Sequence, residues 1–116
     1  MMTRSAHAGF ADTNMQAALA AMQTGEFSTA SKKLLTALTF NPSVEGYILL
    51  SECLMNLNSV DAAIGNLESA EQMAQSTGRL AEVDSLIAQR RALYESVASR
   101  QKNEVSLHQT GDSSPE

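Results

Sequence analysis

The chain has 116 residues, enough for one small domain, and 43% of them are hydrophobic, so a core can be buried. Only 4% are aromatic, and Ala, Leu and Met, which lose little side-chain freedom in a helix, favour an all-α fold. The formal net charge of −5 disfavours nucleic acid and anionic membrane surfaces as partners, because both attract a basic face.

The single cysteine and the absence of long apolar runs indicate the cellular compartment of the protein. Cys53 cannot form an internal disulfide, and its place in the run YILLSECLMNL predicts a small buried hydrophobe in a reducing compartment. No apolar run approaches the ~20 residues that cross a bilayer. The start, MMTRSAHAGFADT, lacks the apolar centre of a secretory signal. We therefore expect a soluble, cytoplasmic protein without membrane insertion.

The two ends of the chain differ in composition from its middle. Residues 1–10 are small and polar without periodicity, which predicts a disordered lead-in. Residues 101–116 include KNEVSLHQTGDSSPE, which is too polar to build a core and predicts a disordered tail. The helical domain is expected over residues 11–100.

The first two helices are bounded by turn residues. ADTNMQAALAAMQ offers Asp12 or Thr13 as an N-cap, and Gly25 follows its end in a position suited to the left-handed conformation. A second helix is expected at 27–40. Pro42 then acts as a stop, because the residue before a proline is driven out of the helical region.

The next two helices begin at serines. Ser43 is expected to cap a helix from Val44 to about Asn56, and Ser59 a helix that reaches about Gln75. Gly78 closes the latter. These connections are short, so consecutive helices should be antiparallel neighbours.

The fifth helix is expected from Leu80 to about Arg100. Much of its apolar set recurs at three and four residues, which predicts one apolar stripe on a long amphipathic helix. The set is Leu80, Val83, Leu86, Ile87, Leu93, Tyr94 and Val97.

The chain repeats when its first helix pair is laid over its second. The matched pairs are Gly25 with Asn58, Phe27 with Val60, Ala30 with Ala63, Leu34 with Leu67, and Ala37 with Ala70. A further shift by the same step places Arg91 where a turn residue stood, so the last helix is expected to continue without a turn.

Helix–turn–helix units at a period near 34 resemble the tetratricopeptide repeat. The resemblance lies in GEF..A...L..AL..NP at Gly25–Pro42 and NSV..A...L..A at Asn58–Ala70. In that family the glycine and the following aromatic form the turn, the alanines allow close helix packing, and the proline ends the second helix. The resemblance implies an all-α fold: an α-α superhelix of two tetratricopeptide-like hairpins plus a long C-terminal capping helix.

The sequence offers little to catalysis. His7 and His108, the only histidines, fall in the segments expected to be disordered, so the helical body has no imidazole base. No Cys or His cluster has zinc spacing, and no glycine-rich phosphate loop occurs. Carboxylates such as Glu68 with Glu71 are typical of a solvated helix face. We expect no catalytic residues, no cofactor, no metal and no enzyme activity.

A protein partner is the remaining expectation. In the tetratricopeptide family the first helix of each hairpin lines a concave surface. Carried onto this chain, the partner-binding set is Met15, Leu19, Met22, Ile48, Glu52 and Met55. Family members that clamp acidic peptides present Lys, Arg and Asn at such positions, and their absence here favours an apolar or amphipathic helix as ligand. The same residues could instead be core, covered by the fifth helix, and for Met22 and Met55 the two interpretations weigh equally.

Two functions are compatible with this set. The first is a non-enzymatic adaptor or chaperone that holds an apolar amphipathic helix of a partner protein. Small cytosolic proteins of bacterial type III secretion, which keep needle or translocator subunits monomeric, are similar in fold and size only. The second is a structural assembly subunit that dimerises, or docks permanently in a larger complex, through the concave face. Two repeats and one helix are near the lower limit for a stable stack, which favours a partner or a homodimer.

Overall fold

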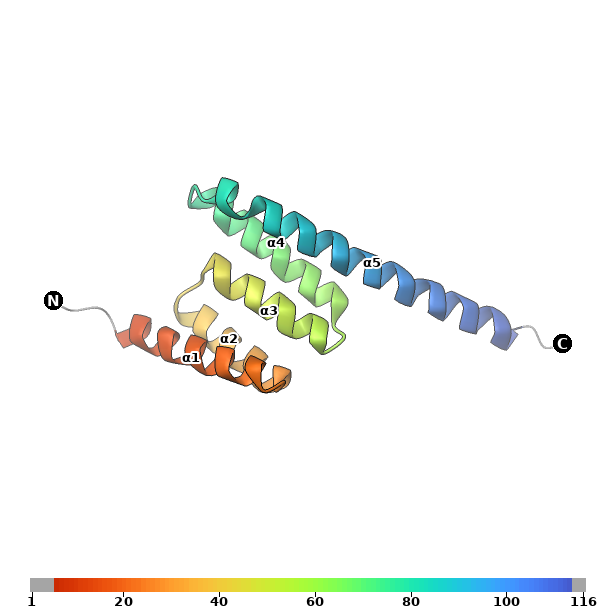
Figure 1. Ribbon diagram of the computed structural model, residues 1–116, viewed down its shortest axis with the longest axis horizontal. Helices are drawn as coiled ribbons and strands as arrows, with labels where there is room; N and C mark the ends of the chain where they lie inside the picture. Colours follow the sequence, from red (N-terminus) through yellow and green to blue (C-terminus); the bar gives the residue numbers. More distant parts are fainter. Residues whose placement is uncertain (1–5, 114–116) are drawn as a thin grey trace.

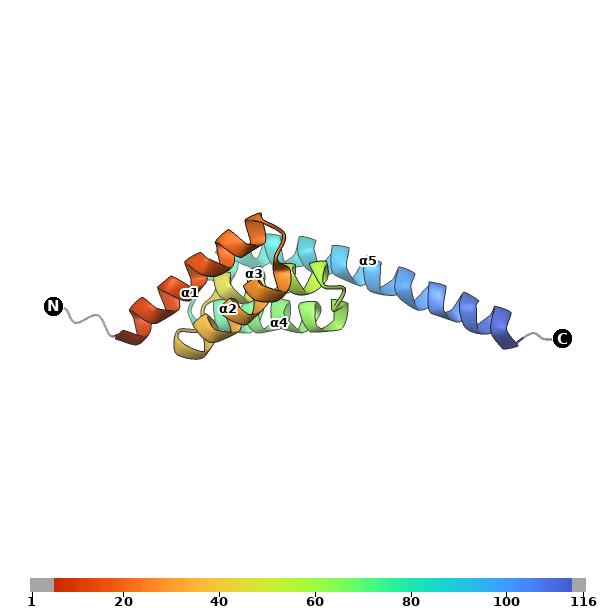
Figure 2. The ribbon, with the colours of Figure 1, turned by 90° about the horizontal axis from the view of Figure 1, so that it is seen from below.

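The computed structural model describes residues 6–113, and the side chains of residues 12–102 within them. This part of the chain forms five helices: α1 (Ala6–Gln23), α2 (Phe27–Phe40), α3 (Val44–Asn56), α4 (Val60–Ser76) and α5 (Leu80–Ser113). The expected all-α fold is confirmed. Helices α1, α3 and α5 lie side by side in one layer, and α2 and α4 form a second layer behind them (Figures 1 and 2).

Three of the four turns share one backbone geometry. Gly25, Asn58 and Gly78 have φ of 79°, 65° and 74°. In each turn the next N–H donates to the carbonyl five residues earlier at 2.8 Å, in the pairs Glu26 to Ala21, Ser59 to Leu54 and Arg79 to Ala74. This is the Schellman arrangement, which satisfies carbonyls at a helix end. Asn58 therefore takes the left-handed role in the second repeat that Gly25 takes in the first.

The fourth turn joins α2 to α3 and works differently. Pro42 follows α2 and prevents its continuation. Ser43 then caps α3, because its Oγ accepts a hydrogen bond from the Gly46 N–H at 2.9 Å. The predicted bounds of α2 and α3 are confirmed, and the predicted cap at Ser43 with them.

Two predicted helix bounds are wrong, and one predicted cap is confirmed in position only. Helix α1 begins at Ala6, so neither Asp12 nor Thr13 caps it. Ser59 stands at the N-cap position of α4 but makes no side-chain cap hydrogen bond. Helix α5 continues to Ser113 instead of ending near Arg100.

Both extended helices run into segments that polarity had marked as disordered ends. Polarity reports that a segment cannot build a core, but it does not stop a helix that is already nucleated. Residues 101–113 contain no proline, so α5 continues through them. Residues 1–5 and 114–116, the remainder of the expected lead-in and tail, lie outside the described residues.

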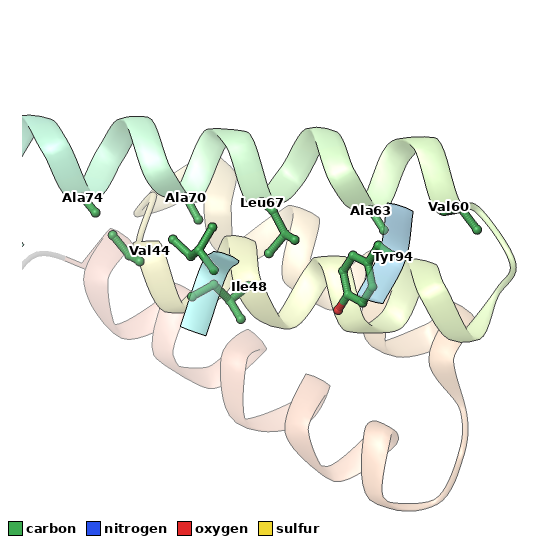
Figure 3. Close-up of a cluster of buried hydrophobic side chains, with 9 residues drawn as sticks. Val44, Ile48, Val60, Ala63, Leu67, Ala70, Ala74 and Tyr94 are labelled. Atoms are coloured by element: carbon green, nitrogen blue, oxygen red, sulfur yellow. The ribbon is translucent and has the colours of Figure 1, made fainter. Parts of the chain in front are cut away.

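The core consists of two clusters that share α3. The N-terminal cluster joins α1, α2 and α3 through Ala18, Ala21, Ala30, Leu34, Leu38, Leu50 and Cys53. The C-terminal cluster joins α3, α4 and α5 (Figure 3) through Val44, Ile48, Val60, Ala63, Leu67, Ala70, Ala74, Ile87 and Tyr94. Ala30 and Ala63, and Leu34 and Leu67, are fully buried in their clusters, so equivalent residues of the two repeats take the same packing role.

Close packing at the start of α3 depends on Gly46. A Cβ added there would lie 2.7 Å from Leu38 Cδ2 of α2 and 3.3 Å from Met15 Cε of α1. The missing side chain therefore lets both helices of the first hairpin approach α3. A stack of this length does not define a superhelical turn, so the expected superhelix stays a prediction.

Candidate partner-binding face

The outward side of the α1, α3 and α5 layer carries one row of residues from each helix. In every row the spacing is four, three and four, which keeps the members on one side of a helix. The α1 row is Asp12, Gln16, Leu19 and Gln23, and the α3 row, its equivalent in the second repeat, is Glu45, Leu49, Glu52 and Asn56. All eight are exposed or half-buried, whereas the buried residues of α1 and α3 lie on other sides.

Helix α5 supplies the third row with the same spacing. Its members are Glu82, Leu86, Gln89 and Leu93, all exposed. The ion pair between Arg90 and Glu52, at 2.6 Å, places this side of α5 next to the α3 row. Leu86 and Leu93 lie four residues before and three after Arg90, so they are its neighbours on the helix surface. We call the three rows together the open face.

The structure places two of the six sequence-predicted residues on the open face. Leu19 is 42% exposed, and the side chain of Glu52 is 30% exposed. Leu19 belongs to the α1 row and Glu52 to the α3 row, so each hairpin of the repeat contributes one of them. As partner-binding residues they stay a prediction.

The other four predicted residues lie in the seams between helices of the layer. Met15 and Met22 are half-buried against the N-terminal cluster, and Met55 against the C-terminal cluster. Ile48 is only 8% exposed and belongs to the C-terminal cluster with Ile87 of α5. Each of these four residues directly precedes a residue of the open face in the sequence. One residue corresponds to a rotation of about 100° around a helix, so their side chains point away from that face.

Helix α5 therefore covers part of the expected groove and leaves part of it open. Ile48 is buried in the cluster that includes Ile87 of α5, so it does not line a free surface. Helix α5 leaves Leu19 exposed and adds two exposed leucines of its own, Leu86 at 40% and Leu93 at 59%. Sequence reasoning missed the α5 leucines as candidate binding residues because it assigned them to the single apolar stripe of the fifth helix, although they lie seven residues apart on the same side of that helix.

One edge of the open face is acidic. Asp12, Glu45 and Glu82 begin the three rows, and Arg79 pairs with both Glu45 and Glu82. The hydrogen bond from Arg79 holds the pKa of Glu45 below its ordinary value, so Glu45 is charged at neutral pH. Three carboxylates against one guanidinium give this edge a net charge of −2. We call it the acidic edge.

The opposite edge and the centre differ from it. The rows end away from the acidic edge at uncharged residues, the amides Gln23 and Asn56 and the leucine Leu93. In the centre, the Glu52 carboxylate is neutralised by Arg90. The open face therefore combines exposed leucines with charge on one side only.

The chemical groups of the described part give no sign of a reaction centre. Cys53 is buried, and burial, with the charge of Glu52, raises its pKa to about 11, so the thiol stays protonated. Among the described residues, no group of His, Cys, Asp and Glu is arranged to hold a metal ion. The side chains of His7 and His108 lie outside the described part. The expectations of no enzyme activity and no cofactor stay predictions.

A separate hollow of about 860 Å³ lies between the start of α4 and α5. Its lining includes Asp61, Ala62, Glu95, Ala98 and Lys102, and none of the predicted partner-binding residues. Within residues 6–113, no helix has both the length and the apolar composition that crossing a bilayer requires.

Comparisons with known proteins add no relative. No family model, no curated protein and no solved structure matches the chain.

Proposed function

We propose that the chain is a non-enzymatic adaptor or chaperone whose open face holds an apolar amphipathic helix of a partner protein. The observation that carries the proposal is the exposure of Leu19, Leu86 and Leu93 on one side of one helix layer. Single exposed leucines are ordinary, but apolar side chains gathered on one face mark a binding surface. Burial of ~600 Å² of apolar surface would contribute on the order of 15 kcal/mol before the costs of association.

The resemblance to tetratricopeptide repeats supports this function through the matched turns at Gly25 and Asn58 and the matched burial of the repeat alanines. The proposal includes a superhelical stack and a cytoplasmic location, where an unpaired thiol such as Cys53 persists. Within it, the needle or translocator subunits of type III secretion are a partner class suggested by similarity in fold and size.

Substitution of the exposed leucines tests the proposal. Leu19→Glu combined with Leu93→Glu should abolish capture of a partner from the native cell, because a carboxylate in the buried interface is costly. Leu35→Glu is the matched control, since Leu35 of α2 is 54% exposed in the other layer. Affinity purification with mass spectrometry should find the same captured protein for the parent chain and for Leu35→Glu. Equal capture by all variants would refute the open face as the binding surface.

A structural assembly subunit is the second candidate. It is favoured by α5, which continues past the turn between α3 and α4 and away from the rest of the stack (Figure 1). A helix that extends beyond the helices it packs against can bind another subunit. Light scattering after size-exclusion would then show a stable dimer of the isolated chain, and the leucine substitutions would convert it to a monomer.

A further inference from the structure

We propose that the bound helix crosses α1, α3 and α5, carries regularly spaced apolar anchors on one side, and is basic along the flank that lies over the acidic edge. This inference rests on the proposed function and specifies its ligand. The chemical class is a cationic amphipathic helix, recognised by leucines in its centre and by carboxylates on one side.

The direction of the helix follows from where the apolar side chains stand. Along α1 or α3, a row contains one leucine between polar residues, Leu19 or Leu49. Across the layer, Leu19, the half-buried Leu49 and Leu86 supply one leucine on each helix, whereas Leu86 and Leu93 are the one leucine pair along a single row. A ligand that crosses the layer therefore reaches leucines of all three helices, and one that lies along α5 reaches those of α5 alone. Glu52 and Arg90 form a salt bridge and neutralise each other, so they leave no net charge beside these leucines.

The spacing of the anchors follows from helix geometry. Packed helices lie about 8–10 Å apart, and a helix rises about 1.5 Å per residue. A crossing helix therefore passes from one helix of the layer to the next in about five to seven residues, and anchors about seven residues apart, which is two turns, stand on the same side of it. Contact with all three helices requires about 11–15 residues at that rise.

Charge on the protein selects the flank of the ligand. The acidic edge of Asp12, Glu45 and Glu82 keeps a net charge of −2 after pairing with Arg79, and the opposite ends of the three rows are uncharged. Lysines on one flank of the ligand helix meet the acidic edge in only one of its two directions. The same charges disfavour a second copy as occupant, because it would bring another acidic edge and a net charge of −5.

Designed peptides test the ligand. The probe is a labelled helical peptide, slightly longer than the crossing requires, with leucine at positions 1, 8 and 15 and lysines on one flank. A second peptide replaces these lysines with glutamates, and a third keeps the lysines but shifts the middle leucine to the opposite side. In fluorescence anisotropy at low salt, we expect binding of the first peptide and at least tenfold weaker binding of the other two.

Protein variants test the acidic edge. Asp12→Asn with Glu82→Gln should weaken binding of the lysine peptide about three- to tenfold, and the loss should shrink at about 0.5 M salt because screening removes exposed charge pairs. The control is Asp61→Asn with Glu95→Gln, which makes the same change in net charge at the hollow between α4 and α5. This control should bind within twofold of the parent chain.

The outcomes separate this inference from the proposed function. If the lysine and glutamate peptides bind equally, or if both double variants weaken binding equally, the inference is wrong and the helix-binding face remains. If the peptide with the displaced leucine binds as well as the first, the crossing geometry is wrong. If no peptide binds and Leu19→Glu with Leu93→Glu leaves cellular capture unchanged, the proposed function is wrong as well.

Discussion

At the scale of single residues, backbone conformation and available space set separate limits on the replacement of a glycine. Gly25 has a φ of 79° and ends α1, whereas Gly65 lies inside α4. A Cβ added at either glycine would meet no atom within 4 Å. Space therefore permits an alanine at both positions. The left-handed conformation disfavours it at one of them, because a Cβ at positive φ lies too close to the following carbonyl.

The two glycines should respond to alanine in opposite directions. Gly25→Ala should lower the free energy of unfolding by about 1 kcal/mol, because an L side chain is strained at positive φ. Gly65→Ala should raise it by about 0.5–1 kcal/mol, because alanine is the better helix former and loses less backbone entropy. Urea unfolding followed by circular dichroism measures both. A stabilised Gly25→Ala protein would contradict the turn geometry.

At the scale of the helix, α5 is attached to both layers by arginines as well as by apolar packing. Arg90 pairs with Glu52 of α3, and Arg91 pairs with Glu68 of α4 at 3.1 Å. The Nε atoms of both arginines are buried without a hydrogen-bond partner. Such an attachment tolerates the loss of one partner poorly, because the remaining charge stays partly buried.

A double-mutant cycle on Glu52→Gln and Arg90→Met measures this attachment. Both side chains are 30% exposed, so we expect a coupling free energy of about 1–2 kcal/mol, between the values of surface pairs and buried pairs. The Arg79–Glu45 pair is the comparison, and its coupling should be smaller because the Glu45 side chain is 58% exposed. Urea unfolding of the four chains gives each cycle. A coupling at Arg90 no larger than that at Arg79 would show that α5 is held by apolar packing alone.

The helices themselves could largely be predicted from sequence, because turn chemistry is local. Pro42, Ser43, Gly25 and Gly78 each act within a few residues, and the bounds of α2 and α3 followed from them. The length of α5 could not be predicted in this way, since no residue in 101–113 dictates a stop.

The candidate site was harder to predict because it depends on rotation about the helix axes. Leu19 and Glu52 lie on the open face, whereas Ile48 is buried in the cluster that includes Ile87 of α5. A shift of one residue turns a side chain by about 100°, and the sequence does not show which neighbour covers it. The pairing of Arg90 with Glu52, which are far apart in the chain, sets that rotation and is visible only in the structure.

At the scale of the whole molecule, α3 connects the two halves of the core. Its residues Leu50 and Cys53 belong to the N-terminal cluster, and Val44 and Ile48 belong to the C-terminal cluster. Tyr47 and Leu54 pack against both. In a stack where each unit contacts only its neighbours, stability is a sum of units and interfaces. A shared central helix makes the interface large relative to either unit, which favours one cooperative transition.

The repeat supplies a matched pair of substitutions to test this cooperativity. Leu34 and Leu67 occupy equivalent positions of the two repeats, and each is fully buried in a different cluster. Leu34→Ala and Leu67→Ala should each cost about 2–4 kcal/mol through lost transfer energy and the cavity left behind. Native-state hydrogen exchange should show that either substitution lowers the protection of amides in α2 and in α4 by the same free energy. If Leu34→Ala lowers protection only in α1 and α2, the halves unfold separately. The open face would then be assembled from two independently stable parts, with the α1 row able to separate from the rows on α3 and α5.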